Sequence, residues 1–387
     1  MSSTSTAVST WLALRPQDSV HVRDGRPFVG GTGGSAHTVR PGPTTVAGAI
    51  GAACHQAGAH RNPAAVRGPL LAEFDPEQGW RSYLPMPRDL VRTDTNKART
   101  DTTDGTDQAL LQRRHLPSDS AAPWAGVVTD LHEKLTLQGR QPLHPLHLHN
   151  VPGKTEPMTG WGSSALLRNY LHGDTLTPGA SKPVPASEFR YGATDPLVSE
   201  RRLGLALDDH RIARTGMLYQ TTHWRLQYDW AFLAEVEDLP CADEQLPHAV
   251  GFGGAGRLAE LERIPGMHWP DAPLAFPDGQ LLLYLATPAA WAEGWLPPIP
   301  AEVSIVAAAL GDPHVVSTAT ADPNRRQRLS GTRRFTTVPA GSVYWLRFPS
   351  AQAAVDWSHD HHGRALGPAV DERLDTAGFG IVLTGVW

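Results

Sequence analysis

The order of strand-like and helix-like segments in the last third of the chain constrains the fold more than any other feature. Four apolar, β-prone segments alternate with two helical segments in the order β-α-β-β-α-β. In chain order they are Gln280–Ala286, a short helix from Thr287 to about Gly294, Glu302–Ala309, Ser342–Phe348, a helix at Ala351–His362, and Phe379–Trp387. This order is that of the ferredoxin-like split unit.

The same order fits the preceding residues if one long insertion is allowed. Its segments are Trp11–Arg15, a helix at Thr44–Ala59, a central hairpin of Met217–Leu226 and Trp230–Glu237, a short helix near Ala242–Leu246, and Arg257–Arg263. The insertion covers about residues 68–200 and contains a polar loop at Thr93–Asp107 and an amphipathic helix at Ser163–His172.

A short repeat and a proline-rich segment separate the two units. Gly-Phe-Gly precedes the last strand of each unit, within Ala249–Gly256 and within Ala377–Gly380. Four prolines fall between Pro265 and Pro277, which indicates a boundary there. We therefore predict an α+β protein with two ferredoxin-like domains, at residues 1–265 and 278–387, and the insertion lies in the first.

The composition agrees with two cores and excludes several classes of protein. The chain has 387 residues, 40% of them hydrophobic, and its 37 glycines and 34 prolines favour many loops. Cys54 and Cys241 are the only cysteines and stand far apart, so the spacing implies neither a disulfide framework nor a thiolate metal site. Without a signal-like start or a membrane-length apolar run, a reducing cytoplasm is the expected compartment.

Charge is distributed unevenly along the chain. The net charge of −5 counts against a free-standing nucleic-acid binder. Residues 323–348 nevertheless hold six arginines and no acidic residue, among them Arg325, Arg326, Arg333 and Arg334. Tyr344 and Trp345 follow directly, and an aromatic ring beside guanidinium groups suits the stacking of unpaired bases. The alternative is a basic, disordered loop that binds no ligand.

Two glycine-rich loops carry the other binding predictions. Gly251–Gly256 fits G-x-G-x-x-G, but a dinucleotide site needs a buried strand before it, and Cys241–Val250 is polar and contains Pro247. We favour backbone N–H groups of Gly253, Gly254 and Gly256 facing phosphates beside Arg257, with a simple tight turn as the alternative.

The second loop follows the first strand. Arg23 and Arg26 flank an Asp-Gly turn, and Gly30–Gly34 comes next. A basic turn beside exposed backbone suits a sugar-phosphate chain. Asp24 can instead pair with either arginine, which would make the turn purely structural.

Histidines are the residues most suited to chemistry. The chain has 18, including His144, His147 and His149 in HPLHLHN and His359, His361 and His362 in SHDHHG. Neither group provides a complete zinc site, and no HExxH, GxSxG or phosphate-loop motif occurs, so we predict no metal, no cofactor and no catalytic residue. The alternative is metal-free RNA cleavage with His21 or His37 as general base.

Several blocks together resemble the third subunit of Cmr modules, the RAMP-superfamily component of type III-B CRISPR effector complexes. RDGRPF at 23–28 and VPAGSVY at 338–344 are the most specific. The others are PGPTTVAGAIGAA at 41–53, ERRLGLALD at 200–208, GMLYQTTHWRL at 216–226, GFGGAGRLAELE at 251–262, LLLYLATPAAWAEGW at 281–295 and GFGIVLTGVW at 378–387. They span nearly the whole chain in the same order as in that family.

The resemblance implies a non-catalytic subunit that binds the 5′ handle of the crRNA through two ferredoxin-like domains. Its partners would be the polymerase/cyclase-like large subunit and the first backbone RAMP subunit, with target RNA reached indirectly and no membrane involved. The positions that match the family's RNA contacts are Arg23, Arg26, Gly253, Gly254, Arg257, Gly341 and Tyr344. A thumb-like hairpin is expected in the insertion. A metal-free crRNA-processing endonuclease of the same superfamily is the alternative function.

Overall fold

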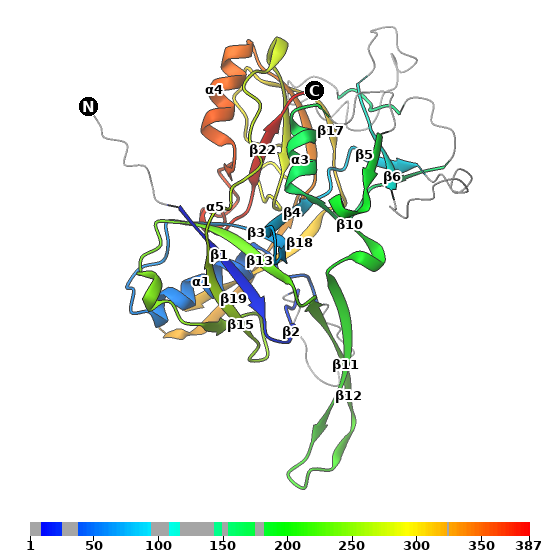
Figure 1. Ribbon diagram of the computed structural model, residues 1–387. Coiled ribbons are helices and arrows are strands. Elements are labelled where there is room, and N and C mark those ends of the chain that lie inside the picture. Colours follow the sequence, from blue (N-terminus) through cyan, green and yellow to red (C-terminus); the bar gives the residue numbers. More distant parts are fainter. Residues whose placement is uncertain are drawn as a thin grey trace.

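The computed structural model describes residues 9–24, 38–93, 108–116, 143–148, 154–174, 182–322 and 325–387. The protein is α+β, rich in sheet and with few helices (Figure 1). Most of the predicted strands and the helices at Thr44–Ala59, Ser163–His172 and Ala351–His362 are confirmed. The predicted polar loop at Thr93–Asp107 lies almost wholly outside the described residues.

The first sheet has the strand order β10-β8-β4-β3-β13-β1-β15-β14, and its neighbouring strands run antiparallel. Its strands are β1 (Ser9–Pro16), β3 (Ala65–Asp75), β4 (Gly79–Pro85), β8 (Trp161–Ser163), β10 (Phe189–Arg190), β13 (Trp230–Glu237), β14 (Ala249–Gly251) and β15 (Leu258–Ile264). Helix α1 (Pro43–Gln56) covers one face, where Val46 and Ile50 pack with Leu12 and Leu14 of β1. Alternation along β1 turns Trp11 and Ala13 to the opposite face.

The second sheet has the order β17-β20-β16-β22-β21. Its strands are β16 (Gln280–Leu285), β17 (Ser304–Ala309), β20 (Val343–Arg347), β21 (Arg364–Ala365) and β22 (Ile381–Gly385). Helix α4 (Ala351–His361) packs on one face through Ala354 and Trp357. The Ser350 hydroxyl caps this helix by accepting a hydrogen bond from the Ala353 amide, at 3.2 Å.

The two sheets share one hydrophobic core. Trp11 and Leu233 of the first sheet belong to the same buried cluster as Leu282 and Trp345 of the second. The second sheet is therefore covered on both faces, by α4 on one side and by the first sheet with α3 (Ser164–Leu171) on the other. This explains why β16 reads as continuous apolar sequence without polar alternation.

A long two-stranded hairpin leaves the body of the molecule (Figure 1). It consists of β11 (Leu197–Leu207) and β12 (Ala213–Leu226), and the short β2 (Ser19–Val20) pairs with β12 at its base. At the tip, the Asp208 carboxylate accepts hydrogen bonds from the amides of His210 and Ile212, at 2.9 and 2.8 Å. We call β11 and β12 the projecting hairpin.

The projecting hairpin corrects one strand prediction. Met217–Leu226 was expected to pair with Trp230–Glu237, but it pairs with β11, and β3 is the neighbour of β13. The physical reason is that alternating apolar residues define a strand without choosing its partner. The segment between β3 and β13 accordingly runs from residue 76 to residue 229.

Two predicted helices are wrong. Residues 287–294 form no helix, because Ala289 and Trp291 make bridges to Val338 and Ala369 and bury their side chains instead. The helix expected near Ala242–Leu246 is only a 3-10 turn at Asp243–Gln245. In both places tertiary burial of a few side chains outweighs a weak local preference.

The remaining elements surround the two sheets. A second hairpin, β18 (His314–Asp322) and β19 (Arg325–Thr337), carries the arginine-rich segment, and we call it the arginine hairpin. A small sheet contains β5 (Leu90–Thr93), β6 (Gln108–Arg113), β7 (Thr155–Pro157) and β9 (Lys182–Pro185). Short helical turns lie at Ala186–Glu188, Gly192–Thr194, Pro277–Gly279 and Arg373–Thr376 (α5). Within the described ranges, no helix has the length and apolar character that crossing a membrane requires.

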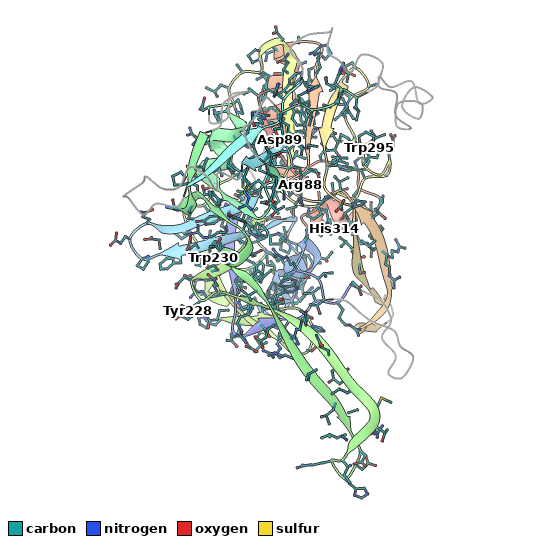
Figure 2. The ribbon with its side chains drawn as sticks, turned by 90° about the vertical axis from the view of Figure 1, so that its right-hand side faces the viewer. Arg88, Asp89, Tyr228, Trp230, Trp295 and His314 are labelled. Carbon is teal, nitrogen blue, oxygen red and sulfur yellow. The ribbon has the colours of Figure 1, made fainter. Side chains whose placement is uncertain are left out.

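A buried polar network fastens the small sheet to the rest of the molecule. The fully buried Asp89 accepts hydrogen bonds from Arg113 Nε at 2.9 Å and from the Tyr170 hydroxyl at 2.8 Å. The Arg113 guanidinium also lies 4.6 Å from the centre of the Tyr170 ring. Figure 2 shows Asp89 inside the body, well away from the projecting hairpin. The network therefore connects β5, β6 and α3 through one ion pair.

Candidate nucleic-acid interface

Three segments that the sequence predicted to bind RNA meet at the base of the projecting hairpin. The amide of Gly254 donates to the carbonyl of His21, at 2.7 Å, which joins the glycine loop Gly251–Gly256 to the turn after β2. The Ser317 hydroxyl of the arginine hairpin donates to the carbonyl of Asp24 in the same turn. We call the residues Asp18, His21–Asp24, Glu200–Arg202, Thr222–Arg225 and Gly251–Arg257 the hairpin-base surface.

The glycine loop combines a fixed base with open backbone. Phe252 is fully buried against Phe232 and anchors the loop. Gly253 has φ +80°, and a Cβ there would lie 2.8 Å from the His21 carbonyl oxygen, so this position requires glycine for packing. Around Gly251 and Gly256, by contrast, nothing lies within 4 Å of the Cβ position. A ligand can therefore approach the main chain closely at these two glycines.

The dinucleotide interpretation of this loop is wrong. The strand before it, β14, is only three residues long, and the loop leads into the strand β15 and not into a helix. A pyrophosphate site of that kind needs the N-terminus of a helix directly after the glycines.

Asp18 holds three arginines together beside the glycine loop. Its carboxylate accepts from Arg202 at 3.1 Å, from Arg225 at 2.7 Å and from Arg257 at 2.6 Å. Burial opposes ionisation of Asp18, but hydrogen bonds from Arg202 and Arg225 prevail and lower the pKa of its carboxyl to about 2. Glu200 also pairs with Arg202 and Arg225, at 2.7 Å each. The cluster thus contains three cations and two carboxylates.

Two histidines lie beside this cluster. The His21 ring stacks on His223 with a centroid separation of 4.8 Å, and its Nδ1 donates to the Thr222 carbonyl at 3.1 Å. His223 is buried and hydrogen-bonded to the Ser19 hydroxyl at 3.0 Å. Burial, followed by the neighbouring His21, Arg202 and Arg257, lowers the pKa of His223. The hydrogen bond to Thr222 places the proton of neutral His21 on Nδ1 and leaves Nε2 as an acceptor.

The other predicted arginines differ in where they lie. Arg23 is exposed, and its backbone forms an isolated β-bridge with Thr38. Arg26 lies outside the described residues. Arg334 stands opposite Ser317 in the arginine hairpin, so it is on the face that contacts Asp24. Arg333 is on the other face and pairs with Asp371 at 3.0 Å. Arg325 and Arg326 begin β19, and their side chains lie outside the description.

The prediction that Tyr344 stacks on bases is wrong. Its side chain is fully buried, its hydroxyl donates to the Trp295 carbonyl at 2.5 Å, and burial raises its pKa well above the ordinary value. Trp345 is buried on the opposite face, because both faces of the second sheet are covered. The neighbouring Gly341 is also buried, and a Cβ there would lie 2.5 Å from the Met86 carbonyl oxygen. Both residues are packing positions.

Four residues of this site were not predicted from the sequence: Asp18, Arg202, Arg225 and His223. The blocks ERRLGLALD and GMLYQTTHWRL contain three of them, but the first begins where the insertion was expected to end, and the second was assigned to the central hairpin. Only the pairing of β12 with β2 brings them beside the glycine loop. Arg40 was not predicted either. It pairs with Asp195 at 2.6 Å, and its guanidinium lies 5.1 Å from the centre of the Trp224 ring, which belongs to the hairpin-base surface.

The two histidine motifs lie elsewhere. His144 and His147 are in a described segment, where His147 forms a bridge with His115, whereas His149 and His37 lie outside the description. His361 stacks on Trp357, and His359 is exposed on α4. In the part of the chain that the structure describes, no three potential metal ligands cluster.

His362 is a structural residue with a testable pH dependence. It is half-buried, its Nε2 donates to the Pro270 carbonyl at 2.7 Å, and its Nδ1 accepts from the Thr384 amide at 3.0 Å. Burial lowers the pKa of His362 below that of an unfolded histidine, and the neighbouring His172 lowers it further. The hydrogen bond to the Pro270 carbonyl and the charge of Asp271 raise the pKa but do not outweigh burial. The unfolded chain therefore binds the proton first, and folding stability is lost as the pH falls below about 6.5.

We expect this effect in urea unfolding of the wild type and of His362→Gln at about pH 7.5 and about pH 5.5. The wild type should lose more stability between the two pH values than the variant, which has no imidazole at this position. Equal losses in both proteins would contradict the assignment.

Comparison with known proteins places the chain among CRISPR-associated proteins. A family model described as CRISPR-associated protein (Cas_Cmr3) matches residues 12–387. Because the match covers nearly the whole chain, the chain belongs to the Cas_Cmr3 family, and the resemblance drawn from the sequence blocks is confirmed. No curated protein sequence matches the chain.

Two chains from solved structures are similar over most of their length. One belongs to the type III-B Cmr-β complex bound to cognate target RNA and AMPPNP, in state 1, with 12% identity, a TM-score of 0.43, and coverage of 90% of this chain and 88% of that chain. The other belongs to the type III-B Cmr-β complex bound to cognate target RNA, with 12% identity, a TM-score of 0.41, and coverage of 90% and 89%. Neither TM-score reaches 0.5, so the family model carries the assignment.

Proposed function

We propose that this chain is a non-catalytic subunit of a type III-B CRISPR effector complex that holds the 5′ handle of the crRNA at the hairpin-base surface. The observation that carries the proposal is the meeting of the glycine loop, the turn after β2 and the arginine hairpin, joined by the contacts of Gly254 with His21 and of Ser317 with Asp24. These segments are far apart in the sequence, and each was predicted to bind RNA for its own reasons.

The chemistry of the surface suits a sugar-phosphate backbone. A guanidinium has five N–H donors, so Arg202, Arg225 and Arg257 keep donors for a phosphate while Asp18 and Glu200 hold them in position. The open main chain at Gly251 and Gly256 lets a phosphate approach closely, because no protein atom crowds these positions. Such contacts fix the position of the RNA and do not read its bases.

The topology supports two ferredoxin-like domains, at residues 1–265 and 278–387. The central strands follow the order β3-β13-β1-β15 in the first sheet and β17-β20-β16-β22 in the second. In both sheets the second strand of the unit is followed by the third, the first and the last. Helix α1 follows the first strand of one unit and α4 precedes the last strand of the other. The second helix of the first unit is reduced to the turn at Asp243–Gln245.

The projecting hairpin is our candidate for the thumb-like element and for contact with partner subunits. Leu203, Leu205 and Leu218 lie toward its tip, and their side chains are 74%, 49% and 68% exposed. Leu205 is paired directly with Leu218, so the ribbon offers an apolar face. We propose the first backbone RAMP subunit and the polymerase/cyclase-like large subunit as partners, target RNA as an indirect one, and the cytoplasm as the compartment.

Gly251→Asp tests the proposed surface. Gly251 is exposed, has no positive φ and has open space at its Cβ, so aspartate fits without strain but places a carboxylate where we place a phosphate. We expect binding of handle RNA by the purified complex to fall at least about tenfold, the equivalent of about 1.4 kcal/mol. Gly251→Ser is the matched control and should bind nearly as the wild type does. Wild-type affinity of Gly251→Asp would contradict the site.

A second candidate function is metal-free cleavage of RNA, and one feature of His21 is consistent with it. Its Nε2 is the acceptor atom that a general base needs, but the adjacent His223 is buried and cannot reach a substrate. Repeat-containing RNA incubated with the protein and EDTA decides between the two functions. Specific cleavage that disappears in His21→Ala would establish the enzyme, whereas intact RNA supports the binding role.

A further inference from the structure

The only two cysteines of the chain come together in the core of the first sheet. Cys54 is in the last turn of α1 and is fully buried, and Cys241 lies in the segment between β13 and β14 and is half-buried. Both belong to the hydrophobic cluster formed by α1 and the first sheet, together with Leu239 and Leu246 from the segment around Cys241. The fold thus joins two residues that the sequence separates widely.

The two thiols share this packed cluster, and Cys241 affects the ionisation of Cys54. Burial, followed by the electrostatic effect of Cys241 and a hydrogen bond with its thiol, raises the pKa of the Cys54 thiol to about 12. Helix α1 also packs against β14, so the segment that carries Cys241 is held beside the helix at its β14 end.

We propose that Cys54 and Cys241 are a redox-responsive pair that closes into a disulfide by exchange with a small organic disulfide. The proposal concerns the chemistry of this pair and stands independently of the RNA-binding role.

The order of the two steps follows from the exposure of the thiols. The half-buried Cys241 reacts first: its thiolate attacks one sulfur of the organic disulfide, a mixed disulfide forms, and one thiolate of the reagent leaves. Cys54 then attacks the Cys241 sulfur, the mixed bond breaks, and the second reagent thiolate takes up the proton that Cys54 loses. The two cysteine thiols are oxidised by two electrons, and the organic disulfide is reduced to two thiols.

The bond would connect α1 to the segment that leads through β14 into the glycine loop. Residues 242–248 contain only a 3-10 turn, in the place where a helix was expected, so this segment has little local structure of its own. A covalent connection to α1 restricts it in the unfolded chain and raises the stability of the folded one.

The experiment uses the full chain and oxidised glutathione, with the intact mass measured under denaturing conditions without reductant. We expect the wild type to lose two hydrogens, to keep no glutathione, and to resist alkylation at both cysteines. Cys54→Ser should accumulate one glutathione on Cys241, because the resolving thiol is absent. Cys241→Ser should remain unmodified while folded, because Cys54 is buried.

Two further readouts make the result decisive. The oxidised wild type should unfold at a temperature a few degrees higher than the reduced protein, and dithiothreitol should reverse this shift. Neither serine variant should show the shift. A wild type that ends with glutathione on Cys241, or with both thiols free to alkylate under conditions that modify Cys54→Ser, would overturn the proposal.

Discussion

Asp89→Ala should lower the free energy of unfolding by about 3–5 kcal/mol, the loss expected when one partner of a buried ion pair is removed. Asp89 is fully buried, and the side chain of Arg113 is 8% exposed. Without the carboxylate, the guanidinium stays in the interior, and among the residues that the structure describes it keeps only the distant Val386 carbonyl at 3.4 Å and the face of the Tyr170 ring as partners. The Tyr170 hydroxyl loses its acceptor as well.

The matched control is Asp271→Ala, which removes an exposed carboxylate. Asp271 pairs with Arg168 at 3.4 Å, and both side chains are more than half exposed, so we expect a change below about 1 kcal/mol. Urea unfolding of both variants measures the difference. A loss for Asp89→Ala no larger than that for Asp271→Ala would show that the network does not hold the small sheet in place.

A double variant separates loss of the pair from loss of packing. Asp89→Leu with Arg113→Met replaces both charges by apolar side chains and leaves no ion unpaired. It should therefore be more stable than Asp89→Leu alone, because the greater part of the cost comes from the charge left behind and not from the missing attraction. A double variant as unstable as the single one would point to the shape of the network as the important factor.

The local sequence pattern predicted the elements whose buried residues follow the regular spacing of a helix or a strand. Helix α1 packs its apolar residues on one cluster, and β1 is a short apolar run that is buried on both faces. Helix α4 buries Ala354 and Trp357 on one face. The segment at 287–294 failed because Ala289 and Trp291 are buried by bridges to residues far along the chain. Helical preference in such a short segment is too weak to compete with that burial.

The site was predicted in its loops and missed in its strands. The glycine loop and the turn after β2 are marked by residue types with special backbone properties, and these can be recognised in a single sequence. Arg202 and Arg225 have no such mark, because alternating residues on a ribbon are ordinary until its partner is known. Tyr344 was misplaced for a related reason, since the sequence does not reveal that both faces of β20 are covered.

The Arg202→Ala and Arg225→Ala double variant should reduce the affinity of the purified complex for handle RNA about 100-fold or more. Each arginine that donates to a phosphate contributes a charge-assisted hydrogen bond, and two such losses of about 1.5 kcal/mol each give this factor. Both residues are held toward the site by Asp18 and Glu200, so little ordering is needed when RNA binds. The slope of log affinity against log salt should also fall, by about 0.7 for each lost contact with a single strand.

The control for this double variant removes the same charge elsewhere. Arg61 pairs with Asp238 on the surface, and Arg347 lies over Trp387, so Arg61→Ala with Arg347→Ala lowers the net charge equally outside the hairpin-base surface. It should leave both the affinity and the salt slope close to those of the wild type. Equal losses in the two double variants would mean that RNA responds to net charge and not to this site.

Asp18→Asn should raise RNA affinity, in contrast to the arginine variant. It tests whether Asp18 matters through its charge or through its hydrogen bonds to the arginines. It removes a negative charge beside three arginines, and with a carboxyl pKa of about 2 that charge is present in the wild type at every pH used for binding. If the arginines face RNA phosphates, the neutral amide should raise RNA affinity at low salt, and the gain should shrink as salt screens the site. A loss of affinity that matches the arginine variant would instead show that Asp18 is needed above all to hold the arginines in position.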